Sequence, residues 1–314
     1  MNTEINENYV SIPKSKNDVF LEKDFFYTCS KELIQNYHSG IISCIEIENY
    51  EIIDKNEVID IIKDTRDILF PFFFKYKKHK EYTIEEMLEN LNRKLLNQII
   101  SALKSNPSGF SETEIIQKSK AICRQYILKL PEIQIMLFHD VEAALKGDPA
   151  ATNCEEIICS YPGFWATMVY RMAHLLYGKV PVLPRIMSEY VHSRTGIDIN
   201  PGAEINDYFF IDHGTGVVIG ETAVIGKHVT IYQGVTLGAI STRDGINLKN
   251  KKRHPTIEND VVIYSGASVL GGNTVIGSNS VIGGNAFVTK SVLPGTKVVQ
   301  SLNTTGSKNS SFNN

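Results

Sequence analysis

The chain has 314 residues, of which 42% are hydrophobic and 21% charged, and its net charge at pH 7 is −3. This supply of apolar side chains excludes a wholly disordered protein, and the weak net charge argues against a dedicated nucleic-acid binder. No apolar run reaches the roughly 18 residues of a membrane-spanning helix. The five cysteines are irregularly spaced and residues 1–16 lack a signal-peptide pattern, so we expect a soluble, cytoplasmic protein.

The first part of the chain has the periodicity of amphipathic helices. Thr83 and Glu86 have the spacing of a capping box, and five aliphatic residues recur behind them at every fourth position. These five are Met87, Leu91, Leu95, Ile99 and Leu103. Similar stretches occupy residues 17–37, 56–78, 112–130, 132–146 and 164–177. We expect a helical domain over residues 1–190 that serves packing and assembly, with Cys154 and Cys159 as helix packing residues.

From about Gly196 the hydrophobic period changes to six. The repeating residues are Ile199, Ile205, Ile211 and Val217, then, after a two-residue shift, Ile219, Ile225, Ile231 and Leu237, and beyond a polar stretch Ile257, Ile263 and Val269, followed after a one-residue slip by Ile276 and Ile282. Small or β-branched residues often follow four places later, as Ala203 and Val229 do. Hexapeptide repeats are typical of a parallel β-helix, in which three hexads form a triangular coil with the aliphatic residues stacked inside.

The domain organisation follows from these two periods. We predict an α + β protein with an N-terminal all-helical domain over residues 1–190 and a parallel β-helix of hexapeptide repeats over residues 191–299. An excursion loop over residues 238–253 interrupts the β-helix. Residues 300–314 are mostly Ser, Asn, Thr and Gly and are predicted to be a disordered tail.

Polar residues first interrupt the repeat at residues 211–216. With about 18 residues in a coil of three hexads, the 15 positions between Asp198 and His213 place these residues on neighbouring turns near one corner. A histidine beside a carboxylate is a minimal general-base unit. From the spacing alone, a solvated pair in a glycine-rich corner is an equally good interpretation.

The second interruption is the loop over residues 238–253, which is followed directly by His254. A long excursion from a compact fold is usually functional or disordered. The loop concentrates positive charge where a carboxylate or phosphate could dock, although a solvated basic loop is the simpler interpretation of its lysines. Arg253 and His254 form a more specific feature, because they stand where the coil resumes.

A metal site is not expected. His213, His228 and His254 could suggest zinc, but their spacings of 15 and 26 do not clearly bring three ligands to bond lengths of about 2 Å.

Several segments together resemble one known family. The β-helical segments are Asp198–Ile205, Ile211–Val224, Gln233–Gly238 and Arg253–Pro255, and the helical ones are Gly147–Ala150 and Tyr170–His174. They resemble the serine O-acetyltransferases, hexapeptide-repeat acyltransferases that make O-acetylserine for cysteine biosynthesis. The resemblance covers roughly residues 140–299, and it implies that the coil is left-handed.

The resemblance also implies a reaction and a catalytic pair. His213 would take the proton from the serine hydroxyl, and Asp198 would orient its imidazole. The serine oxygen would then attack the thioester of acetyl-CoA directly, without an acyl-enzyme.

Five further residues would bind the serine zwitterion by the same resemblance. Asp148 and Asp212 would hold the ammonium group. Arg253 and His254 would face the carboxylate, and Glu221 would lie beside this pocket.

The co-substrate acetyl-CoA would lie in a groove between neighbouring subunits. The positions that match the family's contacts are Ala239, Ser265, Gly266 and Gly284. The loop after Gly238 is about six residues longer than is usual in the family, which weakens this assignment.

The resemblance further implies partners. Family members are homotrimers, some of which pair into hexamers, and L-cysteine often acts as a feedback inhibitor. Many members end in an isoleucine that enters the active site of O-acetylserine sulfhydrylase. This chain ends in Asn313 and Asn314, and an asparagine replaces little of the apolar area that an isoleucine buries, so we expect no stable complex.

Two alternatives stay open. The chain could acetylate another small amino acid or a sugar, or it could be a non-catalytic β-helical scaffold. The pair Asp148 and Asp212 discriminates against a sugar, because a neutral sugar needs no partner for an ammonium group.

Overall fold

The computed structural model describes residues 23–38, 53–74, 82–105, 109–241, 243, 248 and 251–299. The chain divides into two units, Met1–Tyr50 and Glu51–Asn314. In the first unit, helix α1 (Lys23–His38) is described, and its side chains from residue 26 to residue 36 are exposed. The predicted disorder of residues 300–314 lies outside the described residues.

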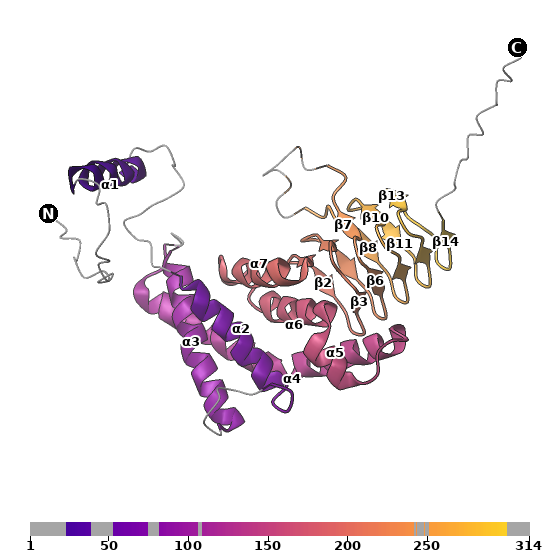
Figure 1. Cartoon of the computed structure of the whole chain (residues 1–314), viewed down its shortest axis with the longest axis horizontal. Helices are drawn as coiled ribbons and strands as arrows, with labels where there is room; N and C mark the ends of the chain where they lie inside the picture. The colour runs from indigo at the N-terminus through magenta and orange to yellow at the C-terminus, as the bar shows by residue number, and fades with distance from the viewer. Residues whose placement is uncertain are drawn as a thin grey trace, which may run out of the picture. The chain divides into compact units, whose positions relative to one another are not determined.

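The second unit begins with the helical part of the prediction (Figure 1). Its helices are α2 (Lys55–Leu69), α3 (Ile84–Lys104), α4 (Glu112–Gly147), α5 (Cys154–Ser160), α6 (Pro162–His174) and α7 (Leu183–Thr195). The capping box of Thr83 and Glu86 is confirmed at the start of α3, and Ser111 and Glu114 form a second one at the start of α4. All five residues of the fourfold repeat in α3 are buried, which confirms the predicted helix face.

Two expectations about the helices were wrong in detail. Residues 112–130 and 132–146 form one helix, α4, which continues through Pro131. A proline inside a helix costs about 3 kcal/mol, but its neighbours Leu130 and Ile133 are both buried in the core and hold the helix together. Cys154 and Cys159 do lie on α5, yet both are exposed, because Ile157 and Ile158 occupy its buried face.

The helical part also extends further than expected. Residue 190 falls inside α7, which ends at Thr195. Gly196 adopts a left-handed conformation, φ 71°, and its N–H bonds the carbonyl of His192 at 2.8 Å. Such a C-cap suits glycine, and the first strand begins two residues later.

Residues 198–298 form a parallel β-solenoid of three narrow sheets (Figure 1). The first sheet contains β1 (Asp198–Ile199), β4 (Val218–Ile219), β7 (Thr236–Gly238), β10 (Ser268–Leu270) and β13 (Phe287–Val288). The second contains β2 (Glu204–Ile205), β5 (Val224–Ile225), β8 (Thr256–Ile257) and β11 (Val275–Ile276). The third contains β3 (Phe210–Asp212), β6 (Thr230–Tyr232), β9 (Val262–Ile263), β12 (Val281–Ile282) and β14 (Lys297–Val298). Successive strands occupy successive sheets, so the chain passes three corners in each turn.

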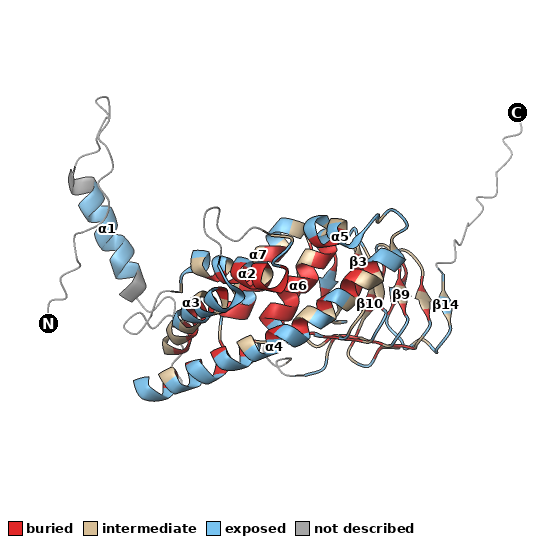
Figure 2. Ribbon diagram, turned by 90° about the horizontal axis from the view of Figure 1, so that it is seen from below, coloured by how far each residue is buried: buried red, intermediate tan, exposed pale blue. Residues whose placement is uncertain are grey.

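The predicted interior of the coil is confirmed. Every aliphatic residue of the sixfold repeat is at most 7% exposed, and the small residues four places later are buried between them. Figure 2 shows this burial along the strands and on the inner side of α6. Because inward residues of neighbouring turns stack in register, as Ile211 does on Ile231, the period of six directly reports the coil.

The breaks in the repeat have structural causes. Asp212 pairs with Tyr232, and Gly216 lies against Gly234, so the corner after β3 holds two more residues than the corner after β6. The additional residues include His213, which is therefore carried out of the regular coil. The later slip adds one residue after Val269, at a corner where Gly271 contacts Ile240 from the excursion loop.

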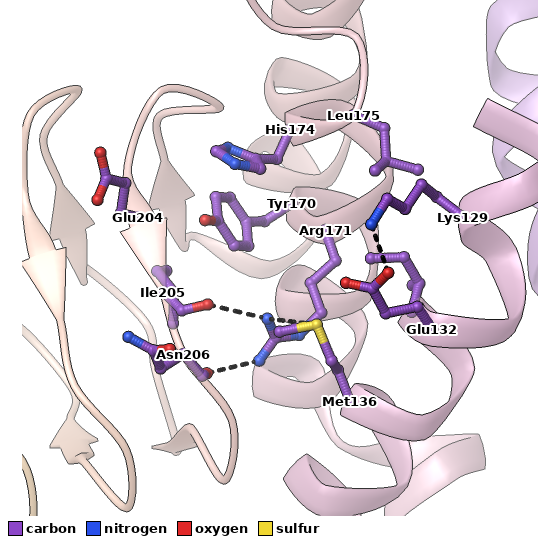
Figure 3. Close-up of a pocket in the computed structure, with 11 residues that line it drawn as sticks. Lys129, Glu132, Met136, Tyr170, Arg171, His174, Leu175, Glu204, Ile205 and Asn206 are labelled. Atoms are coloured by element: carbon purple, nitrogen blue, oxygen red, sulfur yellow. Dashed lines mark hydrogen bonds and ion pairs between the residues drawn. The ribbon is translucent and has the colours of Figure 1, made fainter. Parts of the chain in front are cut away.

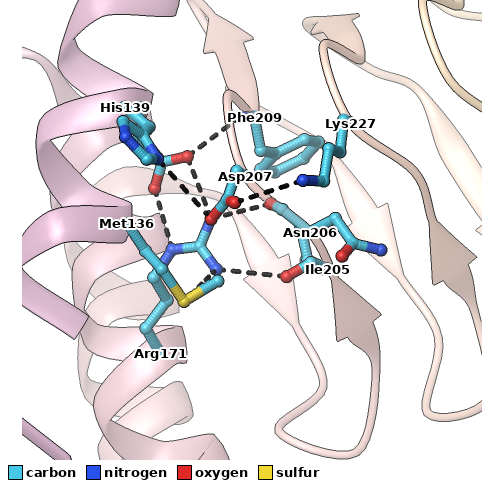
Figure 4. Close-up of polar contacts among 9 residues, drawn as sticks. Met136, His139, Arg171, Ile205, Asn206, Asp207, Phe209 and Lys227 are labelled. Atoms are coloured by element: carbon cyan, nitrogen blue, oxygen red, sulfur yellow. Dashed lines mark hydrogen bonds and ion pairs between the residues drawn. The ribbon is translucent and has the colours of Figure 1, made fainter. Parts of the chain in front are cut away.

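A buried ion pair joins the helices to the first turn of the solenoid (Figure 4). The Arg171 guanidinium donates to both carboxylate oxygens of Asp140, at 2.8 and 2.9 Å, and to the carbonyls of Ile205 and Asn206. Asp140 also accepts from the N–H of Phe209 at 2.9 Å. Because the Arg171 guanidinium and the Asp140 carboxylate both have hydrogen-bond partners in this way, the network fixes α4 and α6 on the corner between β2 and β3.

Candidate active site

The first group of candidate residues surrounds the corner that follows β3. His213 has a left-handed backbone, φ 57°, and its side chain is 73% exposed. Its Nε2 lies 3.9 Å from Oδ1 of Asp212, whose side chain is only 14% exposed. The corner therefore presents an imidazole to solvent beside a half-buried carboxylate.

Asp148 reaches this corner from the helical part, where it caps the C-terminus of α4. Tyr161 donates its hydroxyl to Oδ2 of Asp148 at 2.6 Å, and the N–H of Ala150 donates to Oδ1 at 2.8 Å. These two hydrogen bonds, with a smaller contribution from the nearby His213, lower the pKa of Asp148. The same contact raises the pKa of Tyr161 to about 12. Asp148 is thus held ionised while Tyr161 stays protonated.

Asp198 is the first residue of β1, which pairs with β4, the strand that follows the His213 corner. The N–H of Gly216 bonds the carbonyl of Gly196 at 2.8 Å, so the His213 corner stacks on the residues just before Asp198. Among the residues that the structure describes, no hydrogen bond or ion pair joins the side chains of Asp198 and His213. The two residues occupy neighbouring turns, as their spacing predicts.

The second group of candidate residues lies at the next corner, between the first and second sheets. Glu221 follows β4, and Arg253 ends the excursion loop; their side chains form an ion pair through Nη2 and Oε2. The other Glu221 oxygen, Oε1, accepts a hydrogen bond from the Tyr177 hydroxyl. That hydrogen bond and the Arg253 guanidinium together lower the pKa of Glu221, despite its partial burial.

His254 is held in this second corner and is buried. Its Nδ1 accepts from the N–H of Thr222 at 3.0 Å and lies 2.9 Å from the Thr222 hydroxyl. The imidazole covers Gly220, where any Cβ would come within 2.1 Å of the ring. Burial, followed by the charge of Arg253, lowers the pKa of His254 to about 4. The ring is therefore neutral near pH 7, and its Nε2 has no hydrogen-bond partner among the described residues.

The positions assigned to acetyl-CoA divide between the two corners. Ser265, Gly266 and Gly284 stack above the His213 corner in later turns, where a Cβ on Gly284 would lie 3.2 Å from the carbonyl oxygen of Ser265. Ala239 instead follows β7 at the other corner. At Gly266 the place of a side chain is taken by Asn285, whose Oδ1 would lie 2.3 Å from a Cβ there.

The two groups of candidate residues are separated by one face of the coil. His213 and Glu221 stand at opposite ends of the segment that contains β4, and such a segment is roughly 15–20 Å long at about 3.3 Å per residue. The structure thus gathers Asp148, Asp212 and His213 at one corner and Glu221, Arg253 and His254 at another, within one chain.

Several residues of these corners are missing from the sequence prediction. Tyr161 and Tyr177 lie in the part of the chain that was predicted to serve packing, and no spacing marks their hydroxyls as polar contacts. Tyr232 and Tyr264 stack with ring centroids 5.1 Å apart beside Asp212. Each tyrosine directly follows the buried aliphatic residue of its hexad, and this shared position is the signal in the sequence that could have revealed the pair.

A separate hollow of about 360 Å³ lies between α4, α6 and β2 (Figure 3). Its polar groups are largely paired. The Tyr170 hydroxyl bonds the carbonyl of Ala203 at 2.6 Å, and Lys129 pairs with Glu132. None of the candidate site residues lines this hollow.

No family model matches the chain. A serine acetyltransferase from Synechococcus elongatus is 44% identical over 222 residues, which cover 67% of this chain and 70% of the relative. The chain belongs to the serine acetyltransferase family. It spans about half the length of two further cyanobacterial serine acetyltransferases.

Solved structures of serine acetyltransferases share the fold. Serine acetyltransferase 1 from Entamoeba histolytica, in complex with L-cysteine, is 37% identical, covers 88% of this chain and 98% of its own, and has a TM-score of 0.66. The Neisseria gonorrhoeae enzyme in complex with serine is 27% identical, with coverages of 78% and 95% and a TM-score of 0.52. These matches confirm the predicted family and architecture, and with them the assignment of the chain as an acyltransferase.

Among the described residues, no group of three or more His, Cys, Asp or Glu side chains could hold a metal ion. None of the described helices is long and apolar enough to cross a membrane.

Proposed function

We propose that this chain transfers the acetyl group of acetyl-CoA to the hydroxyl of L-serine, with His213 as the general base. The observation that carries the proposal is the exposed imidazole beside Asp148 and Asp212, in a chain of the serine acetyltransferase family. His213 accepts the hydroxyl proton as the serine oxygen bonds to the thioester carbon. The C–S bond then breaks, and the departing thiolate takes the proton from the imidazolium.

Serine is recognised as a zwitterion. Asp148 keeps its negative charge because Tyr161 and the Ala150 N–H donate to it, and with Asp212 it supplies two carboxylates for one ammonium group. Arg253 supplies a planar cation for the carboxylate, and the neutral His254 adds a hydrogen-bonding nitrogen. A neutral sugar would leave these charges unpaired, which favours an amino acid as the acceptor.

The working enzyme is a homotrimer whose sites lie between chains. Serine spans only a few ångströms, whereas the ammonium-binding and carboxylate-binding corners of one chain are about 15–20 Å apart. A second copy can bring its Arg253 corner to the His213 corner of the first. Three such heterologous contacts, each between the Arg253 corner of one chain and the His213 corner of the next, close three chains into a ring.

Asp198 would orient the imidazole in the assembled site. It occupies the turn next to His213, and the described residues include no hydrogen bond or ion pair between the two side chains. A rotation of the exposed His213 ring toward Asp198 would complete the pair, and the carboxylate would then stabilise the imidazolium.

Acetyl-CoA would run along the column of His213, Ser265, Gly266 and Gly284. The glycines allow the narrow pantetheine arm to approach the backbone. Ala239 would contribute from the corner of the neighbouring chain. The thioester would then arrive beside His213, as direct attack requires.

L-cysteine would inhibit at the serine site. It has the same ammonium and carboxylate groups as serine, so the same residues would bind it. The E. histolytica relative was solved with L-cysteine and the N. gonorrhoeae relative with serine, which supports a shared site for both amino acids.

A cytoplasmic location suits this chemistry. The four cysteines that the structure describes, Cys29, Cys123, Cys154 and Cys159, are free thiols. Free thiols persist in a reducing compartment, where acetyl-CoA is also available.

One assay tests the reaction. Thiol release from acetyl-CoA is followed with L-serine, homoserine, threonine and a galactoside as separate acceptors. We expect L-serine to give the highest kcat/KM. A higher kcat/KM with homoserine, threonine or the galactoside would show that the chain acetylates that acceptor in place of serine. No thiol release with any of the four acceptors would favour a non-catalytic scaffold.

A further inference from the structure

Glu221 is an internal carboxylate beside the cation proposed to bind the substrate carboxylate. An unrestrained carboxylate tends to bind a guanidinium with both oxygens, because two parallel N–H···O bonds form at once. Such bidentate binding would occupy one edge of the Arg253 guanidinium, which a substrate carboxylate also needs. A site with this composition therefore requires something that limits the Glu221–Arg253 contact.

Tyr177 supplies this restraint. Its hydroxyl donates to Oε1 of Glu221, while Arg253 donates through Nη2 to the other oxygen, Oε2. Each Glu221 oxygen thus has its own donor, and the ion pair between Glu221 and Arg253 is monodentate. Among the described residues, the guanidinium makes one other hydrogen bond to oxygen, from Nη1 to the carbonyl of Leu248 at 3.4 Å. Further N–H donors of the guanidinium therefore have no partner in the described part of the chain and could serve a ligand.

The packing around Tyr177 holds the phenol in place. A Cβ on Gly202 would come within 2.6 Å of the Tyr177 Cζ atom and within 2.9 Å of the Glu221 Cγ atom. The absence of a side chain at Gly202 therefore lets the tyrosine and the glutamate meet. Burial, together with the Glu221 hydrogen bond, raises the pKa of Tyr177 to about 12, so the phenol remains a donor at physiological pH.

We propose that Tyr177 is a positioning residue that prevents Glu221 from forming a bidentate ion pair with Arg253. The guanidinium of Arg253 then remains available to the carboxylate of the amino-acid substrate. The inference rests on the proposed function, because it takes Arg253 as the carboxylate-binding residue. Tyr177 itself does not contact the reacting atoms. Its effect reaches the substrate through Glu221 and Arg253.

A double-mutant cycle in the full-length protein tests the inference. The variants are Tyr177→Phe, Glu221→Gln and the combination of both, and KM and kcat are measured for L-serine and acetyl-CoA. Losing a hydrogen bond to a charged group corresponds to about a tenfold change. We therefore expect Tyr177→Phe to raise the serine KM about tenfold and to leave the acetyl-CoA KM nearly unchanged.

The combined variant separates this role from a structural one. A glutamine at position 221 has no charge with which to capture Arg253, so adding Tyr177→Phe to Glu221→Gln should leave the serine KM unchanged. Tyr190→Phe is the matched control, because it removes a hydroxyl that has no hydrogen bond among the described residues. An equal effect of Tyr177→Phe in both backgrounds, or no effect in either, would overturn the proposal.

Direct binding distinguishes failure of this inference from failure of the proposed function. Calorimetric titration of L-serine into the same variants needs no turnover. Serine binding that weakens in Tyr177→Phe alone supports the inference even if the wild-type protein releases no thiol. A wild-type protein that neither binds nor acetylates serine overturns both.

Discussion

His213 is the residue on which the proposed chemistry depends, and its setting is unusual for a solenoid. Two additional residues in the corner after β3 carry it outward, so that its side chain is 73% exposed next to Asp212. A regular hexad would have placed a turn glycine or asparagine there. The deviation from the repeat, rather than the repeat, creates the reactive group.

His213→Ala should therefore abolish nearly all turnover and leave acetyl-CoA binding within a few-fold. A general base contributes roughly 10²–10⁴-fold and acts in the transition state, so the loss falls on kcat. Asp198→Asn should lower kcat by less. Steady-state kinetics give both values, and a His213→Ala enzyme that retains more than about a tenth of the activity would remove His213 from the role of base.

His254 should make the folded state sensitive to acid. Its folded pKa of about 4 lies below the ordinary histidine value of 6.5. The unfolded chain thus binds more protons between these values, and stability that is fully present above pH 6.5 is lost as the pH falls toward 4. The free energy of unfolding should drop by up to about 3 kcal/mol from this group.

Denaturant titrations between pH 7 and pH 4 measure this effect. The pH dependence should be flatter in His254→Gln than in the wild-type protein, because glutamine does not titrate. Parallel curves for the wild-type protein and His254→Gln would show that His254 is not the buried neutral group described above.

At the scale of elements, the site depends on how closely α6 approaches the solenoid. Gly163, in the first turn of α6, lies against β3: a Cβ there would come within 2.1 Å of the carbonyl oxygen of Ile211. That carbonyl precedes Asp212 and His213 directly. The helix that carries the Arg171 anchor therefore also sets the position of the strand that carries the site.

Gly163→Ala should destabilise the protein by about 3 kcal/mol, since the new methyl group meets backbone that cannot move aside alone. It should also lower kcat, because β3 must shift. The control is Gly178→Ala, where no atom lies within 4 Å and only the left-handed backbone, φ 70°, opposes a side chain, at about 1 kcal/mol. Equal losses of stability in the two variants, measured by denaturant unfolding, would contradict the tight contact.

At the scale of the whole molecule, the separation of the two corners predicts that catalysis requires the proposed trimer. Each chain carries a complete set of candidate residues, but the corner proposed to bind the ammonium group and the corner proposed to bind the carboxylate lie at opposite ends of one face of the coil. A chain that is folded but monomeric should bind serine weakly and turn it over slowly.

Mixing two inactive variants tests this arrangement. In the proposed trimer, His213→Ala and Arg253→Ala would each remove one half of every site. Unfolding and refolding them together at equal concentrations should place an intact His213 opposite an intact Arg253 at about a quarter of the interfaces, and so restore about a quarter of the wild-type activity. No recovery from mixed trimers, whose composition mass spectrometry can verify, would place the whole site within one chain.

The sequence by itself determined the solenoid, the family and the identity of the candidate residues. A period of six has no other structural explanation, because stacked turns bury each sixth residue, and Ile231 and Leu237 are fully buried as predicted. The register breaks at His213 and after Val269 were visible for the same reason. Local signals, such as the capping box of Thr83 and Glu86, also predicted helix starts, since those contacts are made within four residues.

Only the tertiary structure decided which candidate residues meet. The sequence brings Asp212, Glu221 and Arg253 into one list, but the triangular cross-section places Asp212 at one corner and the ion pair of Glu221 and Arg253 at another. The sequence also could not reveal that the hydroxyls of Tyr161 and Tyr177 bond to the charged residues Asp148 and Glu221, because the partners are 13 and 44 residues apart along the chain. Contacts at that separation depend on how α6 packs on the first turn, and side-chain spacing contains no information about that packing.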